Sequence, residues 1–106
     1  MGWTKAQKKE ARALFDLALE REYRALIDEV NAREITSREE VWALRDRLNA
    51  KAREMDQKYD YRYSQLIYVF LRLYDDGYLS VEELRRLGDK YEEIDKFFKL
   101  REEYDS

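Results

Sequence analysis

The apolar residues of this chain recur at steps of three and four residues over most of its length, which is the spacing of an amphipathic α-helix. Between residues 41 and 59, for example, the repeat runs through Val41, Leu44, Leu48, Met55 and Tyr59. The 106 residues include no proline, so no position forces a helix to end early. The β-branched residues fall within these helical repeats, so the sequence predicts no strands. We therefore predict an all-α fold.

Four segments carry the side chains typical of a helix N-terminus. Each has a capping residue three positions before a glutamate or glutamine, whose side chain can return the hydrogen bond. These pairs are Thr4 with Gln7, Ser37 with Glu40, Ser80 with Glu83, and Asp89 with Glu92. Interruptions at 35–36, 75–77 and Gly88 mark the ends of helices. The sequence therefore predicts four helices, at about 5–34, 38–75, 81–87 and 90–104.

The first two predicted helices are long, roughly 45–55 Å at 1.5 Å per residue. The first carries an apolar arc about half its circumference wide, which is broader than one partner helix covers. Residues 61–74 are apolar on nearly all sides, which indicates burial under two short C-terminal helices. We expect a single helical domain over residues 1–106, with a two-helix stalk at about 1–60 and a compact head at about 61–106. Because a lone two-helix stalk buries little apolar surface, we expect it to form a homodimer.

The balance of charges limits the classes of partner. Charged residues make up 42% of the chain, yet the net charge is only −3. Without a concentrated basic field to displace phosphate counterions, we expect no nucleic acid partner. No apolar run reaches the length of a membrane span, and the N-terminus has no signal-peptide apolar region. We therefore expect a cytoplasmic protein with no membrane insertion.

The residue types most used in catalysis and metal binding are missing. The chain has no histidine and no cysteine, so it lacks an imidazole base and a thiol nucleophile. The segment 75–83 resembles the second half of a calcium-binding loop, but Arg72 and Tyr74 stand where that loop needs oxygen ligands. The carboxylate pairs lie near helix ends, away from the apolar pocket that a catalytic carboxylate needs. We expect no enzymatic activity, no catalytic residues, no metal site and no cofactor.

One large aromatic residue lies off the apolar repeat. At about 100° per residue, Trp42 falls well away from that repeat, on a charged face that it shares with Arg45, Asp46, Asn49 and Arg53. An aromatic ring among charges on an open face is typical of a protein-binding hot spot. The alternative is that another helix, or a second copy of the chain, covers the ring.

The residues around Trp42 also resemble a known family. The pattern Trp42-x-Leu44-x-Asp46-x-Leu48, followed by Ala50-Lys51 and by Glu54-Met55-Asp56-x-Lys58-Tyr59-Asp60-x-Arg62, is similar to the signature of the fluorescence recovery proteins of cyanobacteria. The likeness extends back to Trp3 and forward to Ile94, so it spans nearly the whole chain.

The resemblance implies an all-helical homodimer that binds the photoactivated orange carotenoid protein, chiefly through that protein's C-terminal domain. Binding would speed the return of the carotenoid protein to its inactive orange form and so end phycobilisome quenching, with no cofactor. By position, the resemblance implies that Trp42 and Asp46 belong to the partner-binding patch, and it places Tyr68 where the family has a phenylalanine on the head. Through this partner the chain would act at the thylakoid surface.

Two positions depart from the family pattern. Arg45 stands where the family usually has histidine, and Ala52 stands where it has a functionally important arginine. The neighbouring Arg53 projects about 100° away around the helix. An alternative function is therefore a structural helical homodimer, engineered or divergent, that keeps the fold without the partner activity. The regular caps and the surface rich in glutamate, lysine and arginine are habits of designed sequences.

Overall fold

The computed structural model describes residues 2–105, and all regular structure within them is helical, so the all-α prediction is confirmed. The elements are α1 (Lys5–Asn31), α2 (Arg38–Lys58), α3 (Leu66–Asp75), α4 (Val81–Leu84), the 3₁₀ helix η1 (Arg85–Lys90) and α5 (Tyr91–Asp105). Residues 1 and 106, the ends of the predicted domain, lie outside the described part. None of the described helices combines the length and the apolar character that a membrane span requires.

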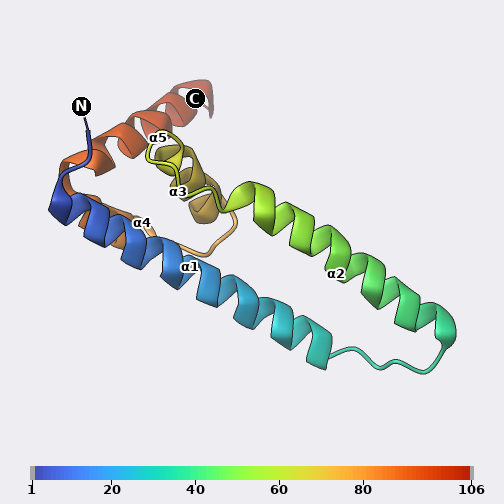
Figure 1. Ribbon diagram of the computed structural model, residues 1–106. Helices are drawn as coiled ribbons and strands as arrows, with labels where there is room; N and C mark the ends of the chain where they lie inside the picture. Colours follow the sequence, from blue (N-terminus) through green and yellow to red (C-terminus); the bar gives the residue numbers. More distant parts are fainter. Residues whose placement is uncertain (1, 106) are drawn as a thin grey trace.

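α1 and α2 run antiparallel as a long arm, and the remaining helices gather at one end of it (Figure 1). We call the arm the stalk and the gathered end the head. The molecule is elongated, with extents of 53 × 37 × 21 Å. The head core includes the first half of α1, which packs on α3 and η1. The buried apolar side chains of this core are Ala11, Leu14, Phe15, Ala18, Leu66, Ile67, Val69, Phe70, Leu71, Leu73, Leu79, Leu84, Leu87 and Ile94.

The prediction of one helix over residues 38–75 is wrong, because the structure divides it into α2 and α3 with an irregular segment between them. Tyr59 leaves the helical region at φ −88° and ψ 73°. The rings of Tyr59 and Tyr61 then meet Phe15 of α1 edge-on, with centroids 5.3 and 4.8 Å apart, and Tyr63 contacts Tyr61 at 5.8 Å. Rings spaced by two residues suit an irregular, partly extended segment. A continuous helix would turn these rings to different sides, so aromatic packing on α1 accounts for the break.

The C-terminal boundaries also differ from the prediction. α4 is one turn long, and η1 connects it to α5, which begins at Tyr91. Gly88 marks the kink within η1, with φ at 61°, a conformation that glycine adopts without strain. Asp89 lies inside η1 rather than before the first turn of α5, and the backbone N–H of Tyr91, at the start of α5, donates to the carbonyls of Gly88 and Asp89.

The other predicted caps are present. Thr4 and Ser80 each form a reciprocal capping box with the side chain three residues on. Ser37 accepts a hydrogen bond from the backbone N–H of Glu40. The Glu40 carboxylate accepts from the backbone N–H of Thr36, at 3.2 Å, rather than from the capping residue. Local side-chain chemistry therefore sets the start of α1, α2 and α4.

A fully buried carboxylate joins the stalk to the head. Glu22 of α1 is 0% exposed. Lys51 and Lys58 of α2 donate to its Oε2 at 2.6 and 2.7 Å, and the Tyr59 hydroxyl donates to its Oε1 at 2.7 Å. Lys58 also donates to Asp76, in the turn after α3, at 2.9 Å. We call these five residues the Glu22 cluster, which links α1, α2 and the turn between α3 and α4.

Two members of the Glu22 cluster, Glu22 and Lys58, keep their charges in spite of their burial. Burial favours the neutral acid, but hydrogen bonds from Lys51, Lys58 and Tyr59 outweigh it and hold the pKa of Glu22 below its ordinary value. Burial works against the charged form of Lys58 as well, yet its bonds to Glu22 and Asp76 raise its pKa. For Tyr59, burial and the Glu22 carboxylate both raise the pKa of the hydroxyl, which stays protonated as a donor.

Two further ion pairs brace the helices. Arg47 of α2 donates two hydrogen bonds to Glu29 of α1, at 2.9 and 2.8 Å, farther along the stalk. Arg21 of α1 donates to both oxygens of Glu83 on α4, at 2.8 and 2.7 Å. The Arg21 hydrogen bonds lower the pKa of Glu83 to about 2.

The first prediction concerns the Glu22 cluster. Among the described residues, Glu22 is the only carboxylate that Lys51, Lys58 and Tyr59 share. Glu22→Gln removes it and leaves the two buried lysines with only the partly exposed Glu54 and Asp76 as counterions, so we expect the free energy of unfolding to fall by about 3 kcal/mol. The matched control is Glu29→Gln, which removes the half-exposed partner of Arg47 and should cost far less. Urea unfolding followed by circular dichroism measures both. Equal losses of unfolding free energy in the two variants would show that the Glu22 cluster stabilises the fold no more than a partly exposed ion pair does.

The second prediction concerns acid. The pKa of Glu83 is about 2 in the folded chain against an ordinary 4.5, so its pair with Arg21 stabilises the fold above about pH 4.5 and loses that effect as the pH falls toward about 2. Because the pair is partly exposed, we expect about 1 kcal/mol. Glu83→Gln keeps the cap and removes the charge. Its deficit in unfolding free energy should be full at about pH 6 and small at about pH 2.5, and a deficit that does not change with pH would contradict the assignment.

Candidate functional site

The outward face of α2 carries the residues predicted around Trp42. Trp42, Arg45, Asp46, Asn49 and Arg53 are all exposed. The side of α2 that faces α1 is taken up by the ion-paired side chains of the stalk and the Glu22 cluster. Around the axis of α2, the side chains that contact α1 therefore point about 180° away from this open face. We call the five exposed residues the Trp42 face.

Trp42, Arg45 and Asp46 form a compact group at the N-terminal end of the Trp42 face. The indole is 56% exposed. The Arg45 guanidinium lies 5.0 Å from the centroid of the ring, and it also donates to Asp46 Oδ1 at 3.0 Å. An exposed ion pair of this kind adds little to stability. A ring, a cation and a carboxylate held side by side are, however, the groups that a protein partner can use as an anchor and its polar rim.

The remaining residues of the Trp42 face, Asn49 and Arg53, extend it by about two turns toward the end of α2. Arg53 Nε donates to the backbone carbonyl of Asn49 at 3.5 Å, so its side chain turns back along its own face. Ala52 is exposed between the Trp42 face and the apolar repeat of α2. Because neighbouring residues of a helix project about 100° apart, Arg53 does not fill the place of a side chain at position 52.

Tyr68 lies apart from the Trp42 face, on α3 in the head. Its ring is 57% exposed and meets Phe97 of α5 edge-on, with centroids 5.8 Å apart. Trp42 stands sixteen residues before the last residue of α2, which is about 24 Å at 1.5 Å per residue. The six residues predicted to bind a partner are therefore divided between two surfaces of one chain.

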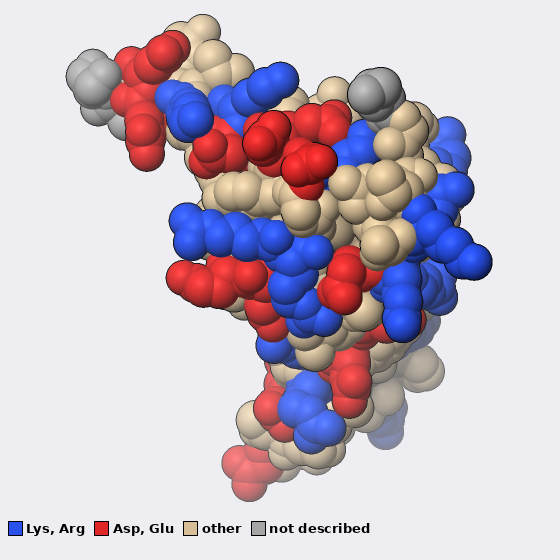
Figure 2. Space-filling view, turned by 90° about the vertical axis from the view of Figure 1, so that its left-hand side faces the viewer, with Lys and Arg blue, Asp and Glu red and all other residues tan. Residues whose placement is uncertain are grey.

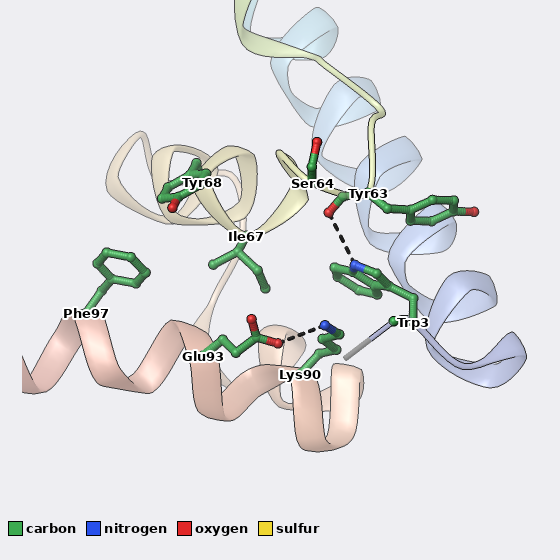
Figure 3. Close-up of a pocket in the computed structure, with 9 residues that line it drawn as sticks. Trp3, Tyr63, Ser64, Ile67, Tyr68, Lys90, Glu93 and Phe97 are labelled. Carbon is green, nitrogen blue, oxygen red and sulfur yellow. Dashed lines mark hydrogen bonds and ion pairs between the residues drawn. The ribbon is translucent and has the colours of Figure 1, made fainter.

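Tyr68 and Phe97 form one side of a pocket of about 380 Å³ in the head (Figure 3). The other side is formed by Trp3, whose indole N–H donates to the carbonyl of Tyr63 at 3.2 Å. At the base an ion pair of 2.9 Å joins Lys90 to Glu93 (Figure 3). The pocket thus combines aromatic walls with a charged base.

Part of the apolar repeat on the stalk has no cover within one chain. Tyr23 and Ile27 of α1 are 51% and 55% exposed, and Val41 and Leu48 of α2 are 45% and 36% exposed. Helical geometry places both pairs on the same flank of the antiparallel stalk. Tyr23 and Met55 line one pocket of about 280 Å³ on this flank, so the apolar surface runs across both helices. We call it the apolar flank.

These surfaces offer the chemistry of binding. Among residues 2–105, no three carboxylate, imidazole or thiol side chains meet as they would around a metal ion. The two most buried charged groups, Glu22 and Lys58, are closed off by the ion pairs of the Glu22 cluster. The open surfaces present aromatic rings with single charges beside them, which are typical of a protein interface.

Two features were not predicted from the sequence, namely the head pocket and the Glu22 cluster. Glu22 follows Ala18 and Phe15 at helical spacing, so it stands on the buried face of α1. Lys51 and Lys58, seven residues apart, share one face of α2. The sequence did contain a signal for the Glu22 cluster. It was a charged residue on the apolar face of one helix, together with opposite charges at a matching spacing on a second helix.

The sequence matches the family described as photoprotection regulator fluorescence recovery protein over residues 3–97. It is 40% identical over 101 residues to the fluorescence recovery protein of Synechocystis, an alignment that covers 92% of this chain and 93% of that protein.

Solved structures of such proteins have a similar fold. The structure of the fluorescence recovery protein from Synechocystis superposes with a TM-score of 0.81 at 38% identity, over 92% of this chain and 98% of that chain. That from Fremyella diplosiphon superposes with a TM-score of 0.78 at 42% identity, over 84% of this chain and 89% of that chain. Sequence and backbone therefore agree along the stalk and the head.

Proposed function

Since this chain belongs to the fluorescence recovery protein family of photoprotection regulators, we propose that it binds the photoactivated orange carotenoid protein, chiefly at that protein's C-terminal domain. Binding accelerates the return of the carotenoid protein to its inactive orange form and so ends phycobilisome quenching at the cytoplasmic surface of the thylakoid. The observation that carries this proposal is the family match over residues 3–97, which includes the whole Trp42 face.

The chain acts through differential affinity. A binding protein shifts an equilibrium only if it binds one state more tightly than the other, and it speeds the conversion only if it also stabilises the transition state. The chain therefore binds the relaxed or partly opened carotenoid protein more tightly than the form with separated domains, or it templates the reassociation of the two domains. Both routes need a surface of fixed shape, which the braced stalk supplies.

The Trp42 face is the primary contact surface in this proposal. The exposed indole supplies a large apolar area to bury, and Arg45 and Asp46 give it polar neighbours of both signs. Hot spots of protein interfaces are rich in tryptophan and arginine for these reasons. Asn49 and Arg53 form the rim of the same contact, and Tyr68 forms a separate contact on the head.

We further propose that the chain is a homodimer through the apolar flank. Tyr23, Ile27, Val41 and Leu48 lie on one side of the stalk and are open to solvent in a single chain. A second copy that covers them removes apolar surface from water, which is the main driving force of such association. The Trp42 face is about a third of a turn away around α2, so it stays open in the dimer.

A structural homodimer without partner activity is the alternative function. The observation in its favour is Ala52, which is exposed beside the Trp42 face where the resembled pattern has an arginine. Arg53 projects to another side of α2 and does not replace that charge. The two functions differ in the recovery assay that follows.

Dark recovery of the photoactivated carotenoid protein, followed by absorbance, tests the function and the Trp42 face together. The wild-type chain should speed recovery, whereas Trp42→Ala should bind about 30-fold more weakly, the equivalent of about 2 kcal/mol. Its helicity and melting temperature should stay near those of the wild type. The matched control is Tyr104→Ala, which truncates another exposed aromatic residue, 88% exposed near the end of α5, and should bind normally.

An unchanged recovery rate with folded wild-type protein would favour the structural alternative. Unfolding or dissociation of Trp42→Ala would instead assign Trp42 to packing.

The homodimer is tested by a charge on the apolar flank. Ile27→Glu places a carboxylate where a second copy would bury it, so we expect the particle mass in light scattering to fall from twice 13.0 kDa to 13.0 kDa. The control is Ala25→Glu, which adds the same charge to the other side of α1 and should leave the mass unchanged. A wild-type mass of 13.0 kDa, or a dimer that survives Ile27→Glu, would contradict the proposal.

A further inference from the structure

A short basic stripe runs along the first two turns of α1. Lys5, Lys8, Lys9 and Arg12 are all exposed, and their spacing of three, four and seven residues places them on one face of the helix. The stripe covers about 10 Å of helix axis at 1.5 Å per residue. Figure 2 looks onto the head and shows basic side chains gathered along its right-hand edge, on the side where α1 begins.

The needs of the fold do not explain these charges. The N-terminus of a helix carries partial positive charge and favours carboxylates. α2, α4 and α5 each have two glutamates in their first turn, whereas α1 and α3 have no acidic residue there. Arg12 is paired with Asp16 at 3.2 Å. Within residues 2–105, Lys5, Lys8 and Lys9 have no carboxylate at salt-bridge distance, so their charges are available to another molecule.

Aromatic rings lie beneath part of the stripe. Lys8 Nζ is 5.0 Å from the centroid of Tyr63, and the Arg12 guanidinium is 4.8 Å from that of Tyr61. The Tyr61 hydroxyl also donates to the backbone carbonyl of Lys8 at 3.4 Å. Cation–π contacts hold both side chains near the surface of the head, so less side-chain freedom is lost when a partner binds.

The charge distribution indicates what kind of partner fits. Residues 1–12 contain four basic and one acidic residue, a net charge of +3, and the whole chain has a net charge of −3, so residues 13–106 carry −6. An extended polyanion, such as a lipid surface or a nucleic acid, would reach beyond the stripe and be repelled by this excess of negative charge. A short acidic segment of a protein meets only the stripe, whose length of about 10 Å matches three extended residues.

We propose that the stripe formed by Lys5, Lys8, Lys9 and Arg12 is a second docking surface, which receives a short acidic segment of the protein partner. This inference rests on the proposed function, because the partner is the carotenoid protein engaged by the Trp42 face. The stripe lies at the start of α1, in the head, whereas Trp42 lies near the start of α2 (Arg38–Lys58), which is at the far end of the stalk (Figure 1). Exposed charges at such a distance steer and orient an approaching partner, and they act on the association rate more than on the lifetime of the complex.

The test is the association rate of the photoactivated carotenoid protein, measured by stopped flow at low and high salt. Lys5→Gln/Lys9→Gln removes two exposed charges and leaves the Lys8 contact with Tyr63 in place. At low salt we expect association to slow about fivefold, with a weaker dependence on salt than in the wild type. The matched control is Arg85→Gln/Lys99→Gln, which changes the net charge equally on η1 and α5 and should alter the rate by less than about twofold.

Each outcome decides between the stripe and the proposed function. Equal slowing in both double variants would assign the effect to net charge and contradict a docking role of the stripe. No slowing in Lys5→Gln/Lys9→Gln would also contradict that role, but it would not affect the proposal for the Trp42 face. Failure of the wild type to bind at all would overturn the proposed function instead.

A labelled hexaglutamate peptide then tests the stripe alone, since the wild type should bind it at low salt and Lys5→Gln/Lys9→Gln should not. Binding to phosphatidylglycerol vesicles or duplex DNA that the same variant abolishes would contradict the assignment to an acidic protein segment.

Discussion

The burial of one carboxylate, Glu22, is the constraint on which the arrangement of this molecule depends. A charge without water is costly unless opposite charges and donors surround it. Lys51, Lys58 and Tyr59 supply them from α2, and Lys58 reaches on to Asp76 in the head. Since these partners come from separate segments, the cluster is satisfied only when α1, α2 and the turn after α3 meet in one relative position. Few other groups in the stalk impose such a geometric condition.

A fixed α2 gives each of its sides a separate role. The side toward α1 holds the stalk together through charged side chains. A second side, with Val41 and Leu48, continues the apolar flank that we assign to a second copy of the chain. The third carries Trp42 and its charged neighbours. Successive residues project about 100° apart, so a helix of 21 residues can present all three surfaces. This division explains how one helix can present separate surfaces for the two protein contacts that we propose.

Local sequence signals predicted what depends on neighbours in the chain. The caps at Thr4 and Ser80 fixed two helix starts correctly, because capping involves residues three apart. The break after Tyr59 was missed, because it depends on Phe15 of another helix, which the apolar pattern of residues 61–74 does not reveal. Glu22 was missed for the same reason, since its partners stand 29 to 37 residues away. The exposure of Trp42 followed from helical periodicity alone, whereas its role as a partner contact remains a proposal.

Native-state hydrogen exchange of the wild-type chain tests the central claim that the Glu22 cluster holds α2 to the head. The backbone amides of the last turn of α2, which ends at Lys58, and of the cap residue Tyr59 lie beside the cluster. If the cluster makes stalk and head one cooperative unit, these amides exchange only with the free energy of global unfolding, as do the amides of α3. Exchange of the α2 amides at a much lower free energy, while α3 stays protected, would show that the stalk opens independently and would contradict the account.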